Sequence, residues 1–382
     1  MARNLDKSSI PENWKYDFLD KFAIRCSGHT PSQSHPEYWN GGIKWISLAD
    51  SNRLDQGYIF ETTKQISDEG IKNSSAVLLP AETVILSRDA GIGKSAVMSE
   101  TMAVSQHFMA WKCDNHEKLH SWFLYNWLQL NKPEFERQAV GSTIKTIGLP
   151  YFKKLKIAVP PFPEQQKIAQ ILSTWDKGIA VTEQLLANSQ QQKKALMQQL
   201  LTGKKRLLDE NGVRFEGEWQ KQRLGSLLKE GKERNKDNSI SRVLSVTNHS
   251  GFVLPENQFS KRIASDEVSH YKVVRKGQYG YNPSRINVGS FARLDQFSEG
   301  LLSPMYIVFS IDSVELDSDF FLYWMQSNEA QQRINNSTQG SVRDSVGFDA
   351  ISSFALKLPK IQEQRKIAKV LSLADQEIET LQ

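Results

Sequence analysis

Short runs of apolar or alternating residues, bounded by Gly, Pro, Asn and Asp, predict β-strands in two separate parts of the chain. The first part has such runs at 43–49, 82–88, 95–100 and 155–160, and the second has them at 242–248, 305–311 and 354–359. Segments rich in Trp and Phe, near 120–130 and 318–327, each predict one helix. The mixture predicts an α+β fold for both parts.

A long amphipathic helix is predicted between these parts, from about residue 163 to about residue 202. Apolar residues recur at spacings of three and four from Ile168 to Leu200. Pro160, Pro161 and Pro163 end the preceding strand and suit the first turn of a helix. About 40 residues span about 60 Å, which is more than the core of one domain requires. We therefore expect this helix to connect two domains, with its apolar seam in an antiparallel coiled coil.

The chain contains an internal repeat of about 200 residues. Residues 141–176 align with residues 340–375 without a gap, at an offset of 199, and 12 of the 36 positions are identical. Trp14 and Trp219 open the two copies, and each is followed five residues later by a leucine. A unit of this length is too long for a solenoid repeat, so we infer a duplicated domain.

The repeat and the helix pattern predict two similar domains, each followed by a helix. The predicted limits are 1–158 and 207–357 for the domains, and 159–206 and 358–382 for the helices. At the offset of 199, a full second helix would continue to about residue 402, whereas the sequence stops at Gln382. We therefore expect the far half of the first helix, around Leu196 and Leu200, to be covered by another subunit or another copy, or to stay mobile.

Composition excludes several classes of protein. The 382 residues are 39% hydrophobic and 24% charged, which is typical of folded domains rather than of a disordered chain. Two cysteines, Cys26 and Cys113, cannot form a disulfide framework, and no apolar run reaches the roughly 18 residues of a membrane span. We expect a cytoplasmic protein without a membrane partner. The net charge of +5 leaves nucleic acid as a candidate partner.

Two motifs resemble nucleotide or metal sites without completing them. Gly91–Ser95 reads like the end of a Walker A loop, but Arg88 stands where the first glycine of that motif is required. Cys113, His116 and His120 have the spacing of metal ligands, but a second cysteine at short spacing is missing. We interpret the first motif as a turn between strands and expect no metal site at the second.

Asn282–Arg285 resembles the Asn-Pro-Pro-aromatic loop of adenine methyltransferases, but the second proline and the aromatic residue are missing. No glycine-rich cofactor strand precedes it, and we find no paired-carboxylate nuclease motif. We expect the chain to catalyse nothing alone.

Several segments of the sequence are similar to those of one known family. The relevant segments are GGIKWISLAD at 41–50, LLPAETVILSRDAGIGK at 78–94, GST at 141–143, PPFPEQQKIAQILSTWDKGIAVTEQLLANSQQQKKALMQQLLTGKKRL at 160–207 and LPKIQEQRKIAKVLSLADQEIETL at 358–381. They resemble the DNA-specificity (S) subunit of Type I restriction-modification systems, in that family's order of recognition domain, helix, recognition domain, helix.

The resemblance implies a non-catalytic subunit that binds double-stranded DNA and reads a bipartite target, one half-site per domain. It implies two methylation (M) subunits, which hold S-adenosylmethionine and modify adenine, and restriction (R) subunits, which use ATP and Mg. It implies no cofactor bound by this chain. The helix length would set the unread spacer between the half-sites. An insertion of seven residues in the polar stretch Asn188–Lys194 should change that spacer with least disturbance of packing.

We predict that DNA is read by polar and basic side chains in loops rather than by strand cores. In the first domain the candidates are Lys44, Arg53, Arg88, Lys94, Ser142, Thr143 and Lys145. In the second they are Arg262, Tyr281, Asn282, Arg285, Asn287, Arg293, Ser341 and Arg343. The predicted subunit interface comprises Trp175, Ile179, Leu185, Leu186, Leu196 and Leu200.

Two other functions stay open at this point. One is a methyltransferase or nuclease in its own right, and the other is an assembly scaffold that does not bind DNA. Incubation with labelled S-adenosylmethionine and DNA would separate the first from a specificity subunit. Competition between specific and random DNA would separate the second.

Overall fold

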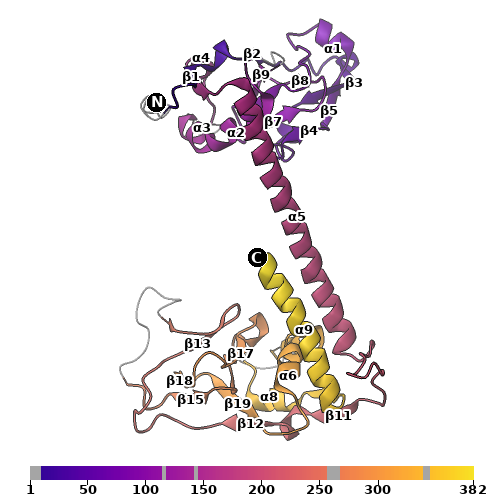
Figure 1. Cartoon of the computed structure of the whole chain (residues 1–382), viewed down its shortest axis with the longest axis vertical. Helices are drawn as coiled ribbons and strands as arrows, with labels where there is room; N and C mark the ends of the chain where they lie inside the picture. Colours follow the sequence, from indigo (N-terminus) through magenta and orange to yellow (C-terminus); the bar gives the residue numbers. More distant parts are fainter. Residues whose placement is uncertain (1–9, 114–117, 142–144, 256–266, 339–344) are drawn as a thin grey trace. The chain divides into compact units, whose positions relative to one another are not determined.

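The computed structural model describes residues 10–113, 118–141, 145–255, 267–338 and 345–382 (Figure 1). The chain divides into two compact units, Met1–Ile179 (unit 1) and Ala180–Gln382 (unit 2), which meet within one continuous helix. Each unit is described by itself. The predicted domain limits of 1–158 and 207–357 leave the two helices outside the domains, and these limits stay predictions.

Unit 1 mixes short strands with helices. Its strands are β1 Lys15–Phe18, β2 Ile24–Ser27, β3 Trp39–Ile46, β4 Tyr58–Ile59, β5 Lys64–Ile66, β6 Val84–Ser87, β7 Ser95–Met98, β8 Ala103–Val104, β9 Phe108–Lys112 and β10 Lys156–Val159. Its helices are α1 Asp68–Lys72, α2 Ser121–Leu130, α3 Lys132–Gln138, α4 Leu149–Lys153 and the first part of α5 Phe162–Leu200. The main sheet has the order β2-β9-β6-β7-β4.

Unit 2 repeats this plan. Its strands are β11 Gln220–Arg223, β12 Leu228–Gly231, β13 Ser245–Thr247, β14 Gly251–Val253, β15 Lys272–Arg275, β16 Tyr279–Tyr281, β17 Phe291–Arg293, β18 Glu299–Leu302, β19 Ile307–Ile311 and β20 Ala355–Leu358. Its helices are α6 Ser318–Met325, α7 Asn328–Thr338, α8 Phe348–Ser353 and α9 Ile361–Leu381, with the rest of α5. The order β12-β19-β16-β17 matches β2-β9-β6-β7 of unit 1. The predicted pair of similar α+β domains is confirmed.

The strand that opens each unit pairs with the strand that precedes its helix. β1 lies antiparallel to β10, and β11 lies antiparallel to β20. A buried glutamine in the first turn of the following helix then bonds the neighbouring backbone. Gln165 donates to the carbonyls of Lys118 and Pro160, and Gln364 donates to those of Glu315 and Pro359. The Glu-Gln signature of the sequence therefore joins each helix to its domain.

The cores of both units form where α2 and α6 cover the central strands. In unit 1, Trp111 on β9 and Leu124 on α2 have no exposed surface. In unit 2, Tyr279 on β16 stacks on Phe309 of β19, with ring centroids 5.1 Å apart, and Phe321 of α6 meets both rings edge-on. Burial of such aromatic rings contributes much of the stability of each unit.

The end of α5 and the whole of α9 pack against each other within unit 2. Ser189 donates a hydrogen bond of 3.0 Å to Glu377, and Lys193 is paired with Asp375. The later residue of α5, Lys193, contacts the earlier residue of α9, Asp375, so the two helices are antiparallel. Ser189 and Lys193 thus bond α9 from within the stretch Asn188–Lys194, whose other five residues are exposed. The effect of an insertion in this stretch stays a prediction.

Leu196 and Leu200 require a second correction. Leu200 is fully buried in the unit 2 core, and Leu196 packs against that core. They do not need another subunit for cover. The error was geometric: in an antiparallel pair the start of α9, not its end, lies beside the end of α5.

Among the described residues, no helix is long and apolar enough to span a membrane.

Candidate nucleic-acid interface

The glycine-containing segment of unit 1 forms a tight loop between β6 and β7. Gly91 and Gly93 have φ of 79° and 81°, values that residues with a Cβ rarely adopt. The amide of Ser87 donates to the carbonyl of Lys94 at 2.8 Å, and the amide of Gly93 donates back to Ser87 at 3.0 Å. The predicted turn between two strands is confirmed, and it sets Arg88 and Lys94 at the two ends of one loop.

A second segment, residues 145–147, is bonded to this loop. The amide of Ile147 donates to the carbonyl of Arg88 at 2.9 Å, and Asp89 accepts hydrogen bonds from Thr146 and from His107. Ser142 and Thr143 lie outside the described residues. Lys145 is among the described residues, and it lies beside the loop that carries Arg88. Sequence positions more than 50 residues apart are therefore brought together, as a shared binding surface requires.

A pocket of about 390 Å³ opens between these segments. Its lining comprises Gly91, Ile92, Lys94, Lys132, Glu136 and Lys145. Three lysines around one pocket form a surface suited to a DNA phosphate. Lys132, at the start of α3, was not among the predicted residues. Nothing in the sequence around it indicates that it lies beside a loop about 40 residues earlier.

Lys132 also holds the neighbouring loop through Asp55. The two side chains are 2.7 Å apart, and Asp55 accepts further hydrogen bonds from Gln129 and from the amide of Ser95. Burial opposes ionisation of Asp55, but the hydrogen bonds from Lys132, Gln129 and Ser95 outweigh it and lower its pKa. The lysine charge is thus partly balanced within the protein.

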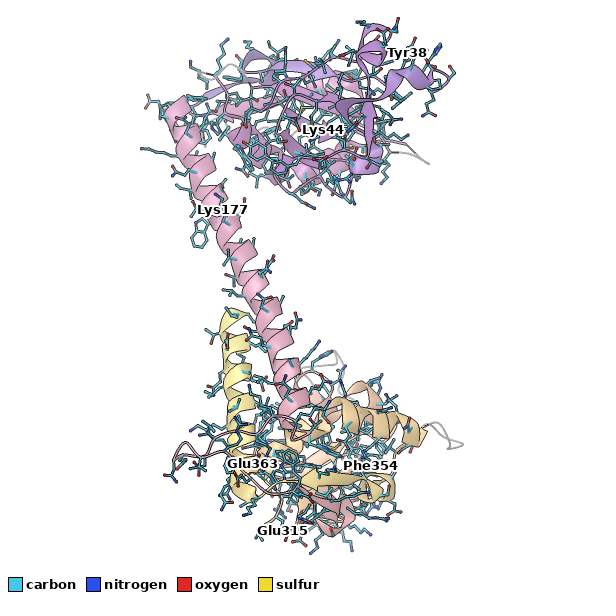
Figure 2. The ribbon with its side chains drawn as sticks, turned by 90° about the vertical axis from the view of Figure 1, so that its right-hand side faces the viewer. Tyr38, Lys44, Lys177, Glu315, Phe354 and Glu363 are labelled. Carbon is cyan, nitrogen blue, oxygen red and sulfur yellow. The ribbon has the colours of Figure 1, made fainter. Side chains whose placement is uncertain are left out.

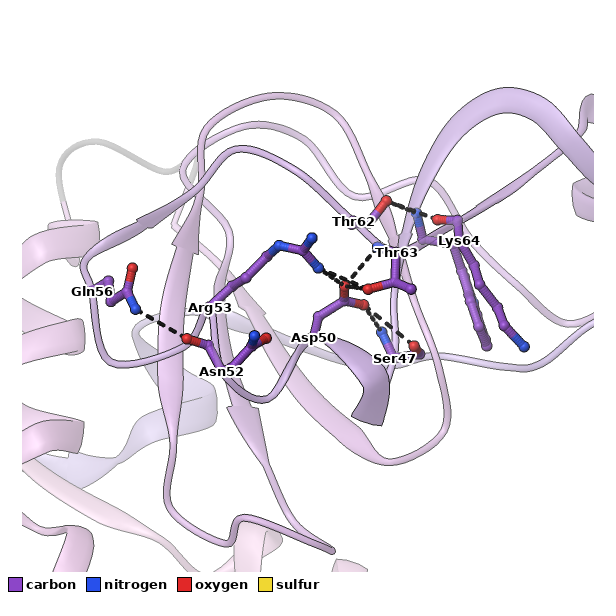
Figure 3. Close-up of polar contacts among 9 residues, drawn as sticks. Ser47, Asp50, Asn52, Arg53, Gln56, Thr62, Thr63 and Lys64 are labelled. Atoms are coloured by element: carbon purple, nitrogen blue, oxygen red, sulfur yellow. Dashed lines mark hydrogen bonds and ion pairs between the residues drawn. The ribbon is translucent and has the colours of Figure 1, made fainter.

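Arg53 lies in a network around the buried carboxylate of Asp50 (Figure 3). Its Nη1 atom donates to Asp50 and to Thr63, both at 2.7 Å, while Asp50 also accepts from the amides of Ser47 and Thr63. Asn52, next to this network, is exposed. Arg53 is therefore half engaged in holding its loop, with 40% of its side chain exposed.

Lys44 is engaged more fully. It lies on β3 rather than in a loop, and its ammonium group donates to Glu100, Glu61 and the carbonyl of Phe60. The hydrogen bond that Lys44 donates to Glu100 is the main cause of the raised pKa of Lys44. This lysine is tied to two carboxylates and could contact DNA only by leaving them.

The corresponding loop of unit 2, residues 282–290, connects β16 to β17. The amide of Val346 donates to the carbonyl of Pro283 at 3.0 Å, in the manner of Ile147 and Arg88 in unit 1. Arg285 and Asn287 are exposed on this loop. Asn282 stands at its start and accepts from the amide of Ser284. Three predicted residues therefore share one loop, supported as in unit 1.

The remaining predictions in unit 2 fare differently. Tyr281 is on β16 and fully buried, and burial raises the pKa of its hydroxyl. It belongs to the core, so its prediction as a DNA contact is wrong. Arg293 is on β17, 17% exposed, and paired with Asp295 and Asp319 at 2.8 and 2.6 Å. Arg262, Ser341 and Arg343 lie outside the described residues.

An apolar stripe runs along the middle of α5, on the stretch that carries Lys177 in Figure 2. Its exposed members are Ile171, Leu172, Trp175, Ile179, Val181 and Leu185. Trp175 exposes 69% of its surface and Ile179 exposes 55%. Leu186 is half-buried. Exposed apolar residues grouped on one helix are typical of a surface that binds another protein.

Comparison with known proteins gives consistent results. The profile of the family described as Type I restriction modification DNA specificity domain matches residues 11–188 and 283–382, more than half of the chain. The MjaIX specificity subunit of Methanocaldococcus jannaschii is 27% identical over 46% of this chain and 40% of its own length. The MjaVIII specificity subunit of the same organism is 22% identical over 97% of this chain and 88% of its own. The chain thus spans less than half of the first relative.

The fold is also similar to a solved structure. The crystal structure of the Type I restriction-modification S subunit from M. genitalium matches 99% of this chain and 92% of its own, with a TM-score of 0.56 and 16% sequence identity. At 16% sequence identity, this similarity shows a shared fold and nothing more.

Proposed function

The chain belongs to the Type I restriction modification DNA specificity family, and from this membership we propose that it is the subunit that selects the DNA target. In this proposal each unit reads one half of a bipartite double-stranded site, and the chain has no catalytic role of its own. We place its action in the cytoplasm.

One observation carries the proposal: both units present the same pair of bonded segments, with different side chains. In unit 1 the loop 88–94 is bonded to residue 147, and in unit 2 the loop 282–290 is bonded to residue 346. A repeated backbone with unlike polar side chains is what two readers of unlike half-sites require. Arg and Lys suit guanine and phosphate, whereas Asn suits adenine.

The partners follow from the stripe on α5. We assign it to methylation subunits, because Trp175 and Ile179 offer the large apolar anchors that dominate protein interfaces. S-adenosylmethionine would be held by those subunits, and ATP and Mg by the restriction subunits. The length of α5 would set the unread spacer.

Co-expression with the methylation subunit, followed by sequencing of methylated genomic DNA, tests the proposal. We expect one bipartite motif with adenine methylated, and no methylation when either subunit is missing. Methylation by this chain alone, or a complex that modifies DNA without a motif, would contradict the proposal.

The assignment of the stripe has its own test. Trp175→Ser should weaken the complex with the methylation subunit at least tenfold, measured by analytical ultracentrifugation or calorimetry. Lys177→Ser, an exposed change on the same stretch of helix, is the matched control and should leave binding unchanged. Equal affinity of both variants would contradict the assignment.

A further inference from the structure

A second loop lies beside the loop 282–290 of unit 2. No sequence motif predicted it. Strands β13 and β14 form a hairpin whose turn, residues 248–250, is exposed. The side chain of Thr247 holds this turn, because its hydroxyl donates to the carbonyl of Gly251 and accepts from the amide of Ser250. Val246 and Phe252, in the strands, are buried in the core. The turn is therefore polar, exposed and mounted on a fixed base.

The hairpin is fastened to the loop 282–290. The buried hydroxyl of Ser290 donates to the carbonyl of Val246 at 2.8 Å. Gly289 has φ of 96°, and a Cβ at this position would lie 3.3 Å from the Cβ of Asn248. The glycine thus permits Asn248 to approach the loop closely. Asn248 and His249 consequently stand next to the loop that presents Arg285 and Asn287.

Unit 1 has a related arrangement, in which a short helical turn at Leu48–Asp50 stands in place of the hairpin. In unit 1 Trp45 pairs in parallel with Ala103, and in unit 2 Val243 pairs in parallel with Leu301, both at an offset of 198. The segment that follows this pair in unit 1, residues 50–53, meets the loop 88–94. Lys94 donates to the carbonyl and the hydroxyl of Ser51 at 2.9 and 3.3 Å. Asn52 is exposed there, beside the network shown in Figure 3.

We infer that these second loops are base-reading elements, with Asn248 and His249 as specificity-determining residues of unit 2 and Asn52, on the corresponding segment, as that of unit 1. The inference rests on the proposed function and deepens it.

The chemistry favours bases over phosphates. Asn52 and Asn248 carry no charge, so they add little to backbone attraction, whereas an amide can bond N6 and N7 of adenine at once. The major groove admits a two-stranded β-ribbon, which is the form of the hairpin in unit 2. We therefore assign an adenine to each asparagine and a purine acceptor to His249.

The experiment changes one asparagine at a time in the complex with the methylation subunit. Asn248→Ala should make one position of one half-site degenerate, and Asn52→Ala should do the same in the other half-site. A bidentate contact discriminates by about 1–3 kcal/mol, so preference at that position should fall roughly 5- to 150-fold. Asn248→Asp, which only accepts hydrogen bonds, should move the preference toward cytosine. Asn211→Ala, an exposed asparagine between α5 and β11, is the matched control.

The outcomes separate the inference from the proposed function. An unaltered motif at unaltered strength in both alanine variants would overturn the inference, as would uniform weakening on all sequences, which marks a phosphate contact. The half-site that each variant leaves intact reports that the protein is folded. A wild-type complex that modifies no bipartite motif would overturn the proposed function itself.

Discussion

The first part of α5 and the whole of α9 carry the same sequence pattern in different surroundings. Ile367 and Leu371 of α9 are almost completely buried, whereas their counterparts at the offset of 199, Ile168 and Leu172, are partly exposed, Leu172 by 39%. α9 is covered by α6 and by the end of α5, and no described element covers Leu172 to the same degree. Periodicity thus predicts which face of a helix is apolar, but the packing partner decides whether that face stabilises the fold or stays available for binding.

The first turns of the two helices differ in a similar way. Glu363 forms two hydrogen bonds with the guanidinium of Arg206, at 2.6 and 2.8 Å, and raises the pKa of that group. Glu164 instead accepts hydrogen bonds from two neutral donors, the indole of Trp14 at 3.1 Å and the amide of Asn13 at 3.5 Å. Trp219, the counterpart of Trp14, has Arg206 over its ring. Arg206 therefore gives Glu363 an ion pair where Glu164 has only neutral donors (the start of α9 is marked by Glu363 in Figure 2).

The largest expected effect contrasts the two leucines. Leu371→Ala should lower the free energy of unfolding by about 2–5 kcal/mol, because it leaves a cavity in the unit 2 core. Leu172→Ala should cost less than about 1 kcal/mol, since that side chain is already partly in water. Chemical denaturation of the purified chain measures both. Equal losses would show that Leu172 is buried in solution.

A smaller difference is expected between the two glutamates. Glu363→Gln should lower stability by about 1.5–3 kcal/mol, the range for a hydrogen bond to a charged group, because Arg206 loses its ion pair. Glu164→Gln should cost about 0.5–1.5 kcal/mol, since a neutral amide oxygen can still accept from Trp14. Thermal unfolding at neutral pH distinguishes them. A larger loss at Glu164 would reverse the comparison.

The smallest effect concerns acid, and it contrasts the loop pairs. In unit 1 the loops are held partly by Asp55, whose pKa is lowered in the fold. A lowered pKa adds stability above the unfolded value of about 3.9, and this stability is lost as the pH falls through the folded pKa. Asp55→Asn should therefore lose stability at pH 6 and show a weaker dependence on pH below about 4.

The loops of unit 2 serve as the comparison for that prediction. They are joined by the neutral bond from Ser290 to Val246. Ser290→Ala should lower stability equally at pH 6 and pH 3, because no titrating group is involved. A loss that changes with pH in this variant would mean that a carboxylate also holds the second pair.

The sequence predicted the architecture better than the site. Strand runs, the long helix and the repeat gave the main elements, because burial periodicity and turn residues act locally. Tyr281 was misplaced because the sequence around a Tyr that precedes an Asn-Pro turn does not show whether the Tyr ends a buried strand or begins the loop. Lys132 and Asn248 were missed because only tertiary contacts place them beside the loops. Leu196 and Leu200 were misassigned because pattern alone does not give the direction of a helix pair.

The pairing of the first and last strands has a consequence at the level of genes. β1 lies beside β10, and β11 lies beside β20, so in each unit the first and last strands lie together next to the start of the following helix. The two helices also start with the same Glu-Gln text. A crossover between the two stretches of coding DNA would exchange one complete unit and leave the scaffold uninterrupted. A change of inherited target sequence would then need one recombination event rather than a series of point mutations.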